Sequence, residues 1–206
     1  MARPRKFDER EVLLAARSRF WRGGYQGTSM SDLCDATGVA SQSLYGAFGS
    51  KHDLFVRTLD EYCAEQLAGL EAGRRSARDA PWEWLLSAVS FDDGGRLGLS
   101  DDGCYLSGST AMLSRTDKDV HKASRRTYER ILGIFGEMVS AAQAAGEVRS
   151  DVAPDRVALA LLAAMQGIEF LRKSGLDDAT FRSAKTSVLD SLNLAYAEPV
   201  ASRKDA

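Results

Sequence analysis

The chain has 206 residues, of which 44% are hydrophobic and 27% charged, and its formal net charge is −2. These values are typical of a folded protein of one or two domains. Its apolar runs are shorter than the roughly 18 to 20 residues needed to span a bilayer. No apolar stretch follows the N-terminal charges in MARPRKFDER, as it would in a secretory signal. We therefore expect a cytoplasmic protein that does not associate with membranes.

Cysteine and histidine spacing argues against a disulfide framework and against a structural metal. The cysteines Cys34, Cys63 and Cys104 are odd in number, widely separated and form no CxxC pair. Neither His52 nor His121 stands at metal-ligand spacing from a second histidine or a cysteine. We expect neither a metal nor a cofactor.

Charge is distributed unevenly along the chain. Through Phe55 the sequence holds eight Lys/Arg and six Asp/Glu, whereas the remainder holds 19 basic and 23 acidic residues. A mildly basic first quarter on an acidic body is compatible with nucleic-acid contact through one end, although many solvated surfaces have the same balance.

Helical periodicity accounts for almost the whole chain, with Ser/Thr/Asp caps, glycine stops and first-turn prolines at the expected boundaries. The expected helices are the segment DEREVLLAARSRFWRGG, a short helix after Thr28 or Ser29, and residues 41–48, 51–73, 81–91, 104–115, 118–145, 154 onward and 176–196. The sequence thus predicts an all-α fold of nine helices without strands. Residues 92–103 are the most loop-like segment. The expected domains are 1–50 and 51–197, followed by a disordered tail at 198–206.

The second and third helices form a pattern typical of a helix-turn-helix, since both are short and Gly38 permits a tight turn between them. In that motif the second helix lies in the major groove and offers its early residues to base edges. Those residues are small or carry an amide, and Gln42 can make a bidentate contact to adenine. Leu44 and Phe48, four residues apart, would face inward. The alternative is a solvated turn in a helical bundle.

The segment GTSMSDLCDATGVASQSLYGAFGSKHDLF resembles the N-terminal domain of TetR-family transcriptional regulators. The resemblance covers roughly residues 7–55 and is carried by Thr28, Ser29, Met30, Gly38, Val39, Leu44, Tyr45, Phe48, Ser50, Lys51 and Leu54. It implies a two-domain regulator that binds double-stranded DNA, rather than an enzyme. It also implies a homodimer, and hence a palindromic operator.

The resemblance assigns roles within this segment. Thr28, Tyr45 and Lys51 match positions that contact phosphates, while Ser41, Gln42, Ser43 and Gly46 match the base-facing set. Many members carry Ser or Thr as the helix cap where this chain has Ala40. Ser41 could replace it as the cap, so both starts of the reading helix remain open.

Three basic residues before the first helix, Arg3, Arg5 and Lys6, resemble the basic arm of many family members. Such an arm can reach phosphates or a narrow minor groove. A disordered, solubilising tail is the alternative, and the two are compatible before DNA is bound.

Apolar residues on the later helices could line a cavity for a largely apolar small-molecule inducer. Core packing is the alternative for each of them. Glu169 could pair with Arg172 or meet a cationic ligand. The expected ligand-binding set is Trp82, Trp84, Phe91, Tyr105, Met112, Phe135, Met138, Met165, Gln166, Glu169 and Phe170.

The resemblance further implies that the last two helices form a four-helix interface with a second copy. VALALLAAMQGIEFL is apolar nearly all round, which suits a helix buried on two sides. The expected interface residues are Ala163, Ala164, Gly167, Phe181, Val188, Leu192 and Tyr196.

Cys104 follows Gly103 at an expected helix N-terminus, where partial positive charge favours a reactive thiolate. The Gly-Cys-x-Leu entry resembles that of family members that sense electrophiles or oxidants. A buried small hydrophobe is the alternative, and Asp101 and Asp102 would oppose thiolate formation.

The leading functional hypothesis is a dimeric, ligand-responsive DNA-binding regulator, most simply a repressor. An enzyme is disfavoured because the sequence holds no GxSxG elbow, HExxH, glycine-rich phosphate loop or close carboxylate pair. A third hypothesis is a ligand-binding or interaction module of the same fold that does not bind a specific operator.

Overall fold

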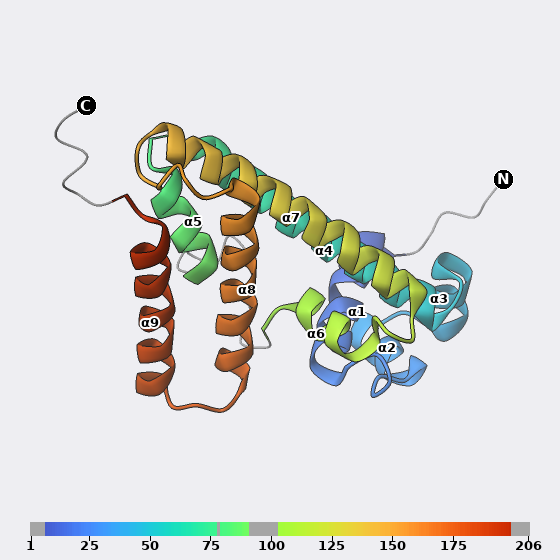
Figure 1. The fold of residues 1–206 in the computed structure, drawn as a ribbon. Helices are drawn as coiled ribbons and strands as arrows, with labels where there is room; N and C mark the ends of the chain where they lie inside the picture. Colours follow the sequence, from blue (N-terminus) through green and yellow to red (C-terminus); the bar gives the residue numbers. More distant parts are fainter. Residues whose placement is uncertain (1–6, 78, 91–102, 199–206) are drawn as a thin grey trace. The chain divides into compact units, whose positions relative to one another are not determined.

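The computed structural model describes residues 7–77, 79–90 and 103–198, and these residues are overwhelmingly helical (Figure 1). The described helices are α1 (Glu9–Gly23), α2 (Met30–Thr37), α3 (Ser41–Phe48), α4 (Lys51–Ser76), α5 (Pro81–Ser90), α6 (Tyr105–Leu113), α7 (Lys118–Ala144), α8 (Pro154–Lys173) and α9 (Asp178–Tyr196). An isolated antiparallel bridge joins Val148 and Ala197. The predicted all-α class is confirmed.

The chain divides into two compact units. Unit 1 takes residues from Met1–Ala64 and Tyr105–Ser124, and unit 2 from Glu65–Cys104 and Arg125–Ala206. The division into compact units therefore differs from the predicted domain boundary after residue 50. The first half of α4, all of α6 and the first residues of α7 belong to the same unit as α1, α2 and α3.

Unit 1 is built around an aromatic cluster whose members come from α1, the loop after it, α4 and α6. The ring centroids of Phe20 and Phe55 lie 5.2 Å apart, edge to face, and Trp21 and Tyr62 meet in the same way at 5.2 Å. Each such pair adds about 1 kcal/mol beyond the burial of its apolar area. The members of the aromatic cluster are Phe20, Trp21, Tyr25, Phe55, Tyr62 and Tyr105.

Unit 2 has a separate apolar core, formed by the second half of α4, by α5, α8 and α9, and by the part of α7 that belongs to this unit. Leu85, Ile134 and Leu161 are fully buried in it. Trp82 anchors α5, since its Nε1–H donates to Asn193 at 2.8 Å and its backbone N–H donates to the Glu147 carboxylate at 2.9 Å. No helix among the described residues combines the length and the apolar character of a membrane span.

Helix boundaries follow local capping signals. The Ser50 hydroxyl accepts from the Asp53 N–H at 3.0 Å and so caps α4, and Asp117 caps α7, both as predicted. Asp177 accepts from Ala179 and Thr180, so α9 begins at Asp178, two residues later than expected. Cys104 precedes α6 instead of opening it.

Candidate DNA-binding site

The start of α2 is held by a reciprocal cap. The Ser29 hydroxyl accepts from the Asp32 N–H at 3.1 Å, and the Ser29 N–H donates to the Asp32 carboxylate at 2.7 Å. Arg19 of α1 adds an ion pair to Asp32 at 3.1 Å. Together these contacts fix the entry of α2 against α1.

The turn between α2 and α3 depends on Gly38, whose φ of 68° and ψ of 13° lie in the left-handed region. The Gly38 N–H donates to the Cys34 carbonyl at 2.8 Å, which ends α2. Val39, buried behind the turn, donates its N–H to the Thr37 hydroxyl at 3.3 Å. This geometry sets the angle at which α3 leaves α2.

Helix α3 has a buried side and an exposed side. Leu44 and Phe48 are buried, as predicted, while Gln42, Ser43 and Gly46 are exposed and Tyr45 is 48% exposed. A Cβ placed on Gly46 would meet nothing within 4 Å, so packing inside the chain does not require glycine there. The exposed side is therefore flat and polar, and its backbone could come close to a partner.

The open question of where α3 begins is answered by the structure. The helix begins at Ser41, and Ala40 occupies the cap position without a side-chain hydrogen bond. Ser41 does not replace it as the cap. Ser41 is half-buried, so of the predicted base-facing set it is the least accessible in the free protein.

The first turn of α4 adds a cation next to this surface. The Lys51 Nζ lies 4.4 Å from the centroid of the Tyr25 ring, in cation–π geometry. Tyr25 thereby positions the side chain of Lys51, a role that was not predicted from the sequence. The only sequence signal for Tyr25 is its place three residues before Thr28, in YQGT.

Thr28 requires a correction. It was expected among the phosphate contacts, but it is fully buried, and its hydroxyl donates to the Gly24 carbonyl at 2.8 Å. Its side chain holds the loop between α1 and α2 from inside. The basic arm residues Arg3, Arg5 and Lys6 lie outside the described residues.

The expected ligand-binding residues are not brought together as one set. Trp82, Phe135, Met138 and Met165 belong to the core of unit 2, with Trp84 packed against it. Gln166 is half-buried on α8, and Phe91 lies outside the described residues.

Tyr105 and Met112 belong to unit 1, so their expected place beside the other ligand residues is not supported. The Tyr105 ring packs in the aromatic cluster and its hydroxyl lies 3.0 Å from that of Thr58. Burial raises the pKa of Tyr105 well above its usual range. Met112 is 66% exposed, and Phe170 of α8 is 73% exposed. Neither lines an interior.

Glu169 is buried in unit 2 and its carboxylate is fully engaged. It pairs with Arg172 at 2.8 Å, the first of the two predicted alternatives, and with Lys173 at 3.5 Å. It also accepts the Cys104 N–H at 2.5 Å. The carboxylate thus ties the segment before α6 to α8.

The expected interface residues fall on two different surfaces. Ala163 and Gly167 are exposed on α8, and Ala164 is half-buried. On α9, however, Phe181, Val188, Leu192 and Tyr196 lie in or against the core of their own unit. Amphipathic spacing identified the apolar side of α9 but could not indicate which partner covers it.

Comparison with known proteins agrees with this geometry. Residues 12–58 match the family model described as "Bacterial regulatory proteins, tetR family". The chain is 28% identical over 180 residues to the HTH-type transcriptional repressor ComR of Escherichia coli, covering 84% of this chain and 83% of ComR.

Two solved structures share the fold. The reduced form of E. coli NemR has a TM-score of 0.77 at 15% identity, covering 93% of this chain and 98% of NemR. A cysteine mutant of the TetR-family regulator CifR, complexed with 26-bp operator DNA, has a TM-score of 0.73 at 23% identity. That match covers 92% of this chain and 99% of CifR.

A capped α2, a left-handed glycine and a short α3 with one exposed polar side together make a helix-turn-helix. The proteins that the chain resembles are transcriptional regulators, not enzymes. Residues 12–58 thus match the TetR family of bacterial regulatory proteins, and the chain as a whole resembles a transcriptional repressor over most of its length.

Proposed function

We propose that this protein is a homodimeric repressor that binds a palindromic operator and is released from it by a small molecule. The observation that carries the proposal is the exposed side of α3, where Gln42, Ser43 and Gly46 stand free of other packing. The relation to ComR, named a transcriptional repressor, favours repression over activation. Such a regulator works beside the chromosome, in the cytoplasm.

Each exposed group has a chemical role in this proposal. Gln42 can donate one hydrogen bond to N7 of an adenine and accept one from its N6, and the absence of a side chain at Gly46 lets the backbone approach the bases. Tyr45, on α3 itself, and Lys51, in the first turn of α4, would bind phosphates. Arg3, Arg5 and Lys6 would add contacts that depend strongly on salt.

Dimerisation is supported by an exposed apolar stripe on α8. Leu159 is 55% and Phe170 73% exposed, and Ala163 and Gly167 lie between them at helical spacing. A Cβ on Gly167 would meet nothing within 4 Å, which leaves space for the close approach of a second helix. Two copies related by a twofold axis would present two α3 helices to a palindrome.

Helix α4 could transmit the binding of an inducer in unit 2 to unit 1. It is one uninterrupted helix whose first half belongs to unit 1 and whose second half belongs to unit 2. An inducer held by apolar residues of unit 2 would displace α4 and change the separation of the two α3 helices. The inducer must bind the two states with different affinities. Crystal structures with the same separation with and without inducer would contradict this route.

A gel-shift titration of the full chain against its own upstream DNA and a random duplex, at several salt concentrations, tests operator binding. We expect preference for the upstream DNA and an affinity that falls steeply with salt. Equal, weak binding to both duplexes would instead support an interaction module without a specific operator.

Two substitutions separate base reading from phosphate binding. Gln42→Ala should reduce discrimination at one base position by about 1–3 kcal/mol, whereas Lys51→Ala should weaken binding to every duplex and lower the salt slope by about 1. Lys118→Ala, which removes an exposed lysine at the start of α7, is the matched control for lost charge. Equal losses in all three variants would exclude a specific role for α3.

A second candidate trigger is the thiol of Cys104, a half-buried residue that forms no disulfide. Lys173 lies against the neighbouring Gly103, and the Glu169 carboxylate accepts the Cys104 N–H. Hydrogen peroxide should release DNA from the wild type and from Cys34→Ser, but not from Cys104→Ser. Unchanged release from Cys104→Ser would exclude this trigger.

A further inference from the structure

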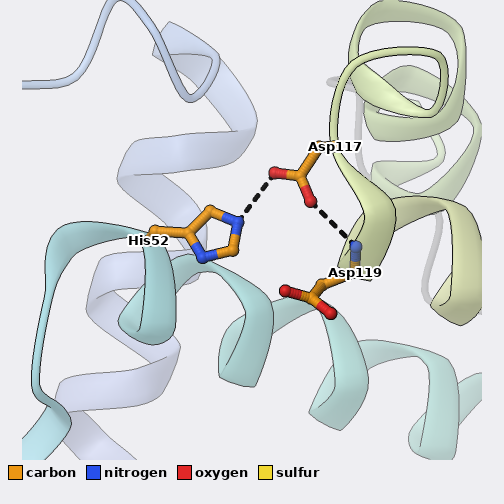
Figure 2. Close-up of side chains that lie close together, drawn as sticks. All are labelled: His52, Asp117 and Asp119. Atoms are coloured by element: carbon orange, nitrogen blue, oxygen red, sulfur yellow. Dashed lines mark hydrogen bonds and ion pairs between the residues drawn. The ribbon is translucent and has the colours of Figure 1, made fainter.

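Three potential metal ligands converge within unit 1, where α4 and α7 begin (Figure 2). His52 is the second residue of α4, Asp117 immediately precedes α7 and Asp119 is its second residue. One ligand atom from each side chain lies within 4.8 Å of the other two. The three side chains point toward one another from two helices far apart in sequence.

Asp117 is oriented by its role as a helix cap. Its Oδ1 accepts the N–H of Asp119 at 3.0 Å and that of Val120 at 3.2 Å. Its Oδ2 is thereby directed at the His52 Nε2, 2.7 Å away. Hydrogen bonds that fix one oxygen of a carboxylate prearrange the other for a metal ion. The Asp117 side chain is only 15% exposed, so water screens this oxygen weakly.

Three carboxylates lie near His52. Asp117 and Asp119 lie on one side of the imidazole, and Asp53 of the same helix acts on it as well. Lys122 pairs with Asp119 at 3.5 Å, but both side chains are more than half exposed, and such pairs are weak. The Tyr25 ring packs edge-on against the imidazole at 6.1 Å. A bound cation would offset the repulsion between these carboxylates.

Asp117 also lines a hollow of about 680 Å³, together with several basic side chains. The hollow gives room for water molecules on the open coordination positions of an ion held by Asp117. The remaining lining residues of this hollow are Ser114, Arg115, Thr116, Lys118, His121 and Lys122.

We propose that His52, Asp117 and Asp119 bind a divalent transition-metal ion such as Zn²⁺. One imidazole with two carboxylates suits Zn²⁺, Co²⁺, Ni²⁺ or Mn²⁺ better than Ca²⁺, which takes six to eight oxygen ligands. Ligand bonds of about 2.0–2.2 Å at tetrahedral angles place adjacent ligand atoms about 3.3–3.6 Å apart. The ion therefore takes the place of the proton shared by His52 and Asp117, and their 2.7 Å separation opens by roughly 0.6–0.9 Å. This site is independent of whether α3 reads an operator.

The test titrates the full chain, with its cysteines reduced and after chelator treatment, with Zn²⁺ by calorimetry and with Co²⁺ by absorption. His52→Gln keeps an N–H donor for Asp117, and Asp119→Asn changes a half-exposed side chain. We expect each to weaken Zn²⁺ binding at least about tenfold. His121→Gln, the other histidine of the chain, should leave the affinity unchanged, and Co²⁺ should give visible bands without thiolate charge-transfer absorption in the near ultraviolet.

Thermal unfolding followed by circular dichroism establishes that the variants are folded. If His52→Gln does not fold, the Zn²⁺ affinity of Asp119→Asn alone decides the test. Equal affinity in the wild type and the variants would place the ion elsewhere and overturn the proposal. Thiolate charge-transfer bands would assign binding to cysteine, and the absence of any binding would overturn it as well.

Discussion

At the scale of single residues, Asp32 makes the stability of unit 1 depend on pH. The Ser29 backbone N–H, then the Ser29 hydroxyl and Arg19, lower the pKa of Asp32 to about 2 from the ordinary 3.8. Because the folded-state pKa is the lower one, the stabilisation is complete above about pH 4 and is lost as the pH falls toward 2.

We therefore predict that Asp32→Asn lowers the stability of the protein at pH 7 and that the difference from wild type shrinks below pH 4. Urea unfolding across this pH range measures it. Asp35→Asn, on the exposed side of the same helix, is the control and should have little effect. A deficit that stayed constant down to pH 2 would contradict the role of the ionised cap.

Glu169 makes the second prediction at this scale. Replacing it by alanine leaves Arg172 and the Cys104 N–H without their carboxylate, so we expect a loss of about 2 kcal/mol in unfolding free energy. Glu129→Ala removes the partner of Arg125 in an ion pair with both side chains well exposed, and should lose under about 0.5 kcal/mol. If chemical denaturation showed the same loss of unfolding free energy in Glu169→Ala and Glu129→Ala, the importance of burial would be contradicted.

At the scale of helices, α3 and α8 each have a cap position without a capping side chain. Ala40 precedes α3 and Ala153 precedes α8, and neither makes a side-chain cap hydrogen bond. A serine hydroxyl at either position can accept an N–H of the first turn. We predict that Ala40→Ser and Ala153→Ser each stabilise the protein by about 1 kcal/mol.

Denaturant midpoints measure this gain. The glycine variants at the same positions are the controls, because glycine is accepted at a cap position but offers no hydroxyl. A serine variant no more stable than its glycine counterpart would show that the exposed N–H groups are already satisfied by water.

Local sequence predicted these helices well because their boundaries are set by short-range chemistry. Ser50 with Asp53 and Asp117 before α7 were recognised from residue type and spacing alone. Where a second local signal competed, the boundary moved. Asp177 caps α9, so the helix begins at Asp178 and not at Leu176.

At the scale of the whole molecule, the exposed stripe on α8 predicts the oligomeric state. Leu159→Asp places a charge on the face proposed to bind a second copy, so we expect a dimer in the wild type and a monomer in the variant. Light scattering with size-exclusion chromatography measures this. Met112→Asp, at an equally exposed residue of unit 1, should remain dimeric. A dimeric Leu159→Asp variant would exclude this face.

The sequence by itself determined the all-α class, the capped α2, the Gly38 turn and the buried pair Leu44 and Phe48, because each depends on neighbours within a few residues. It also contained the motif that resembles the TetR family, continuous from Thr28 to Leu54.

Only the tertiary structure decided which distant residues meet. It placed Tyr105 in the aromatic cluster of unit 1, turned the apolar side of α9 toward its own core and brought His52 to Asp117, 65 residues later. From the sequence, the spacing of the histidines argued against a metal ligand. That spacing is no guide here, because the carboxylates near His52 come from another part of the chain. Such contacts depend on how helices pack, and packing is not encoded in any short stretch of the chain.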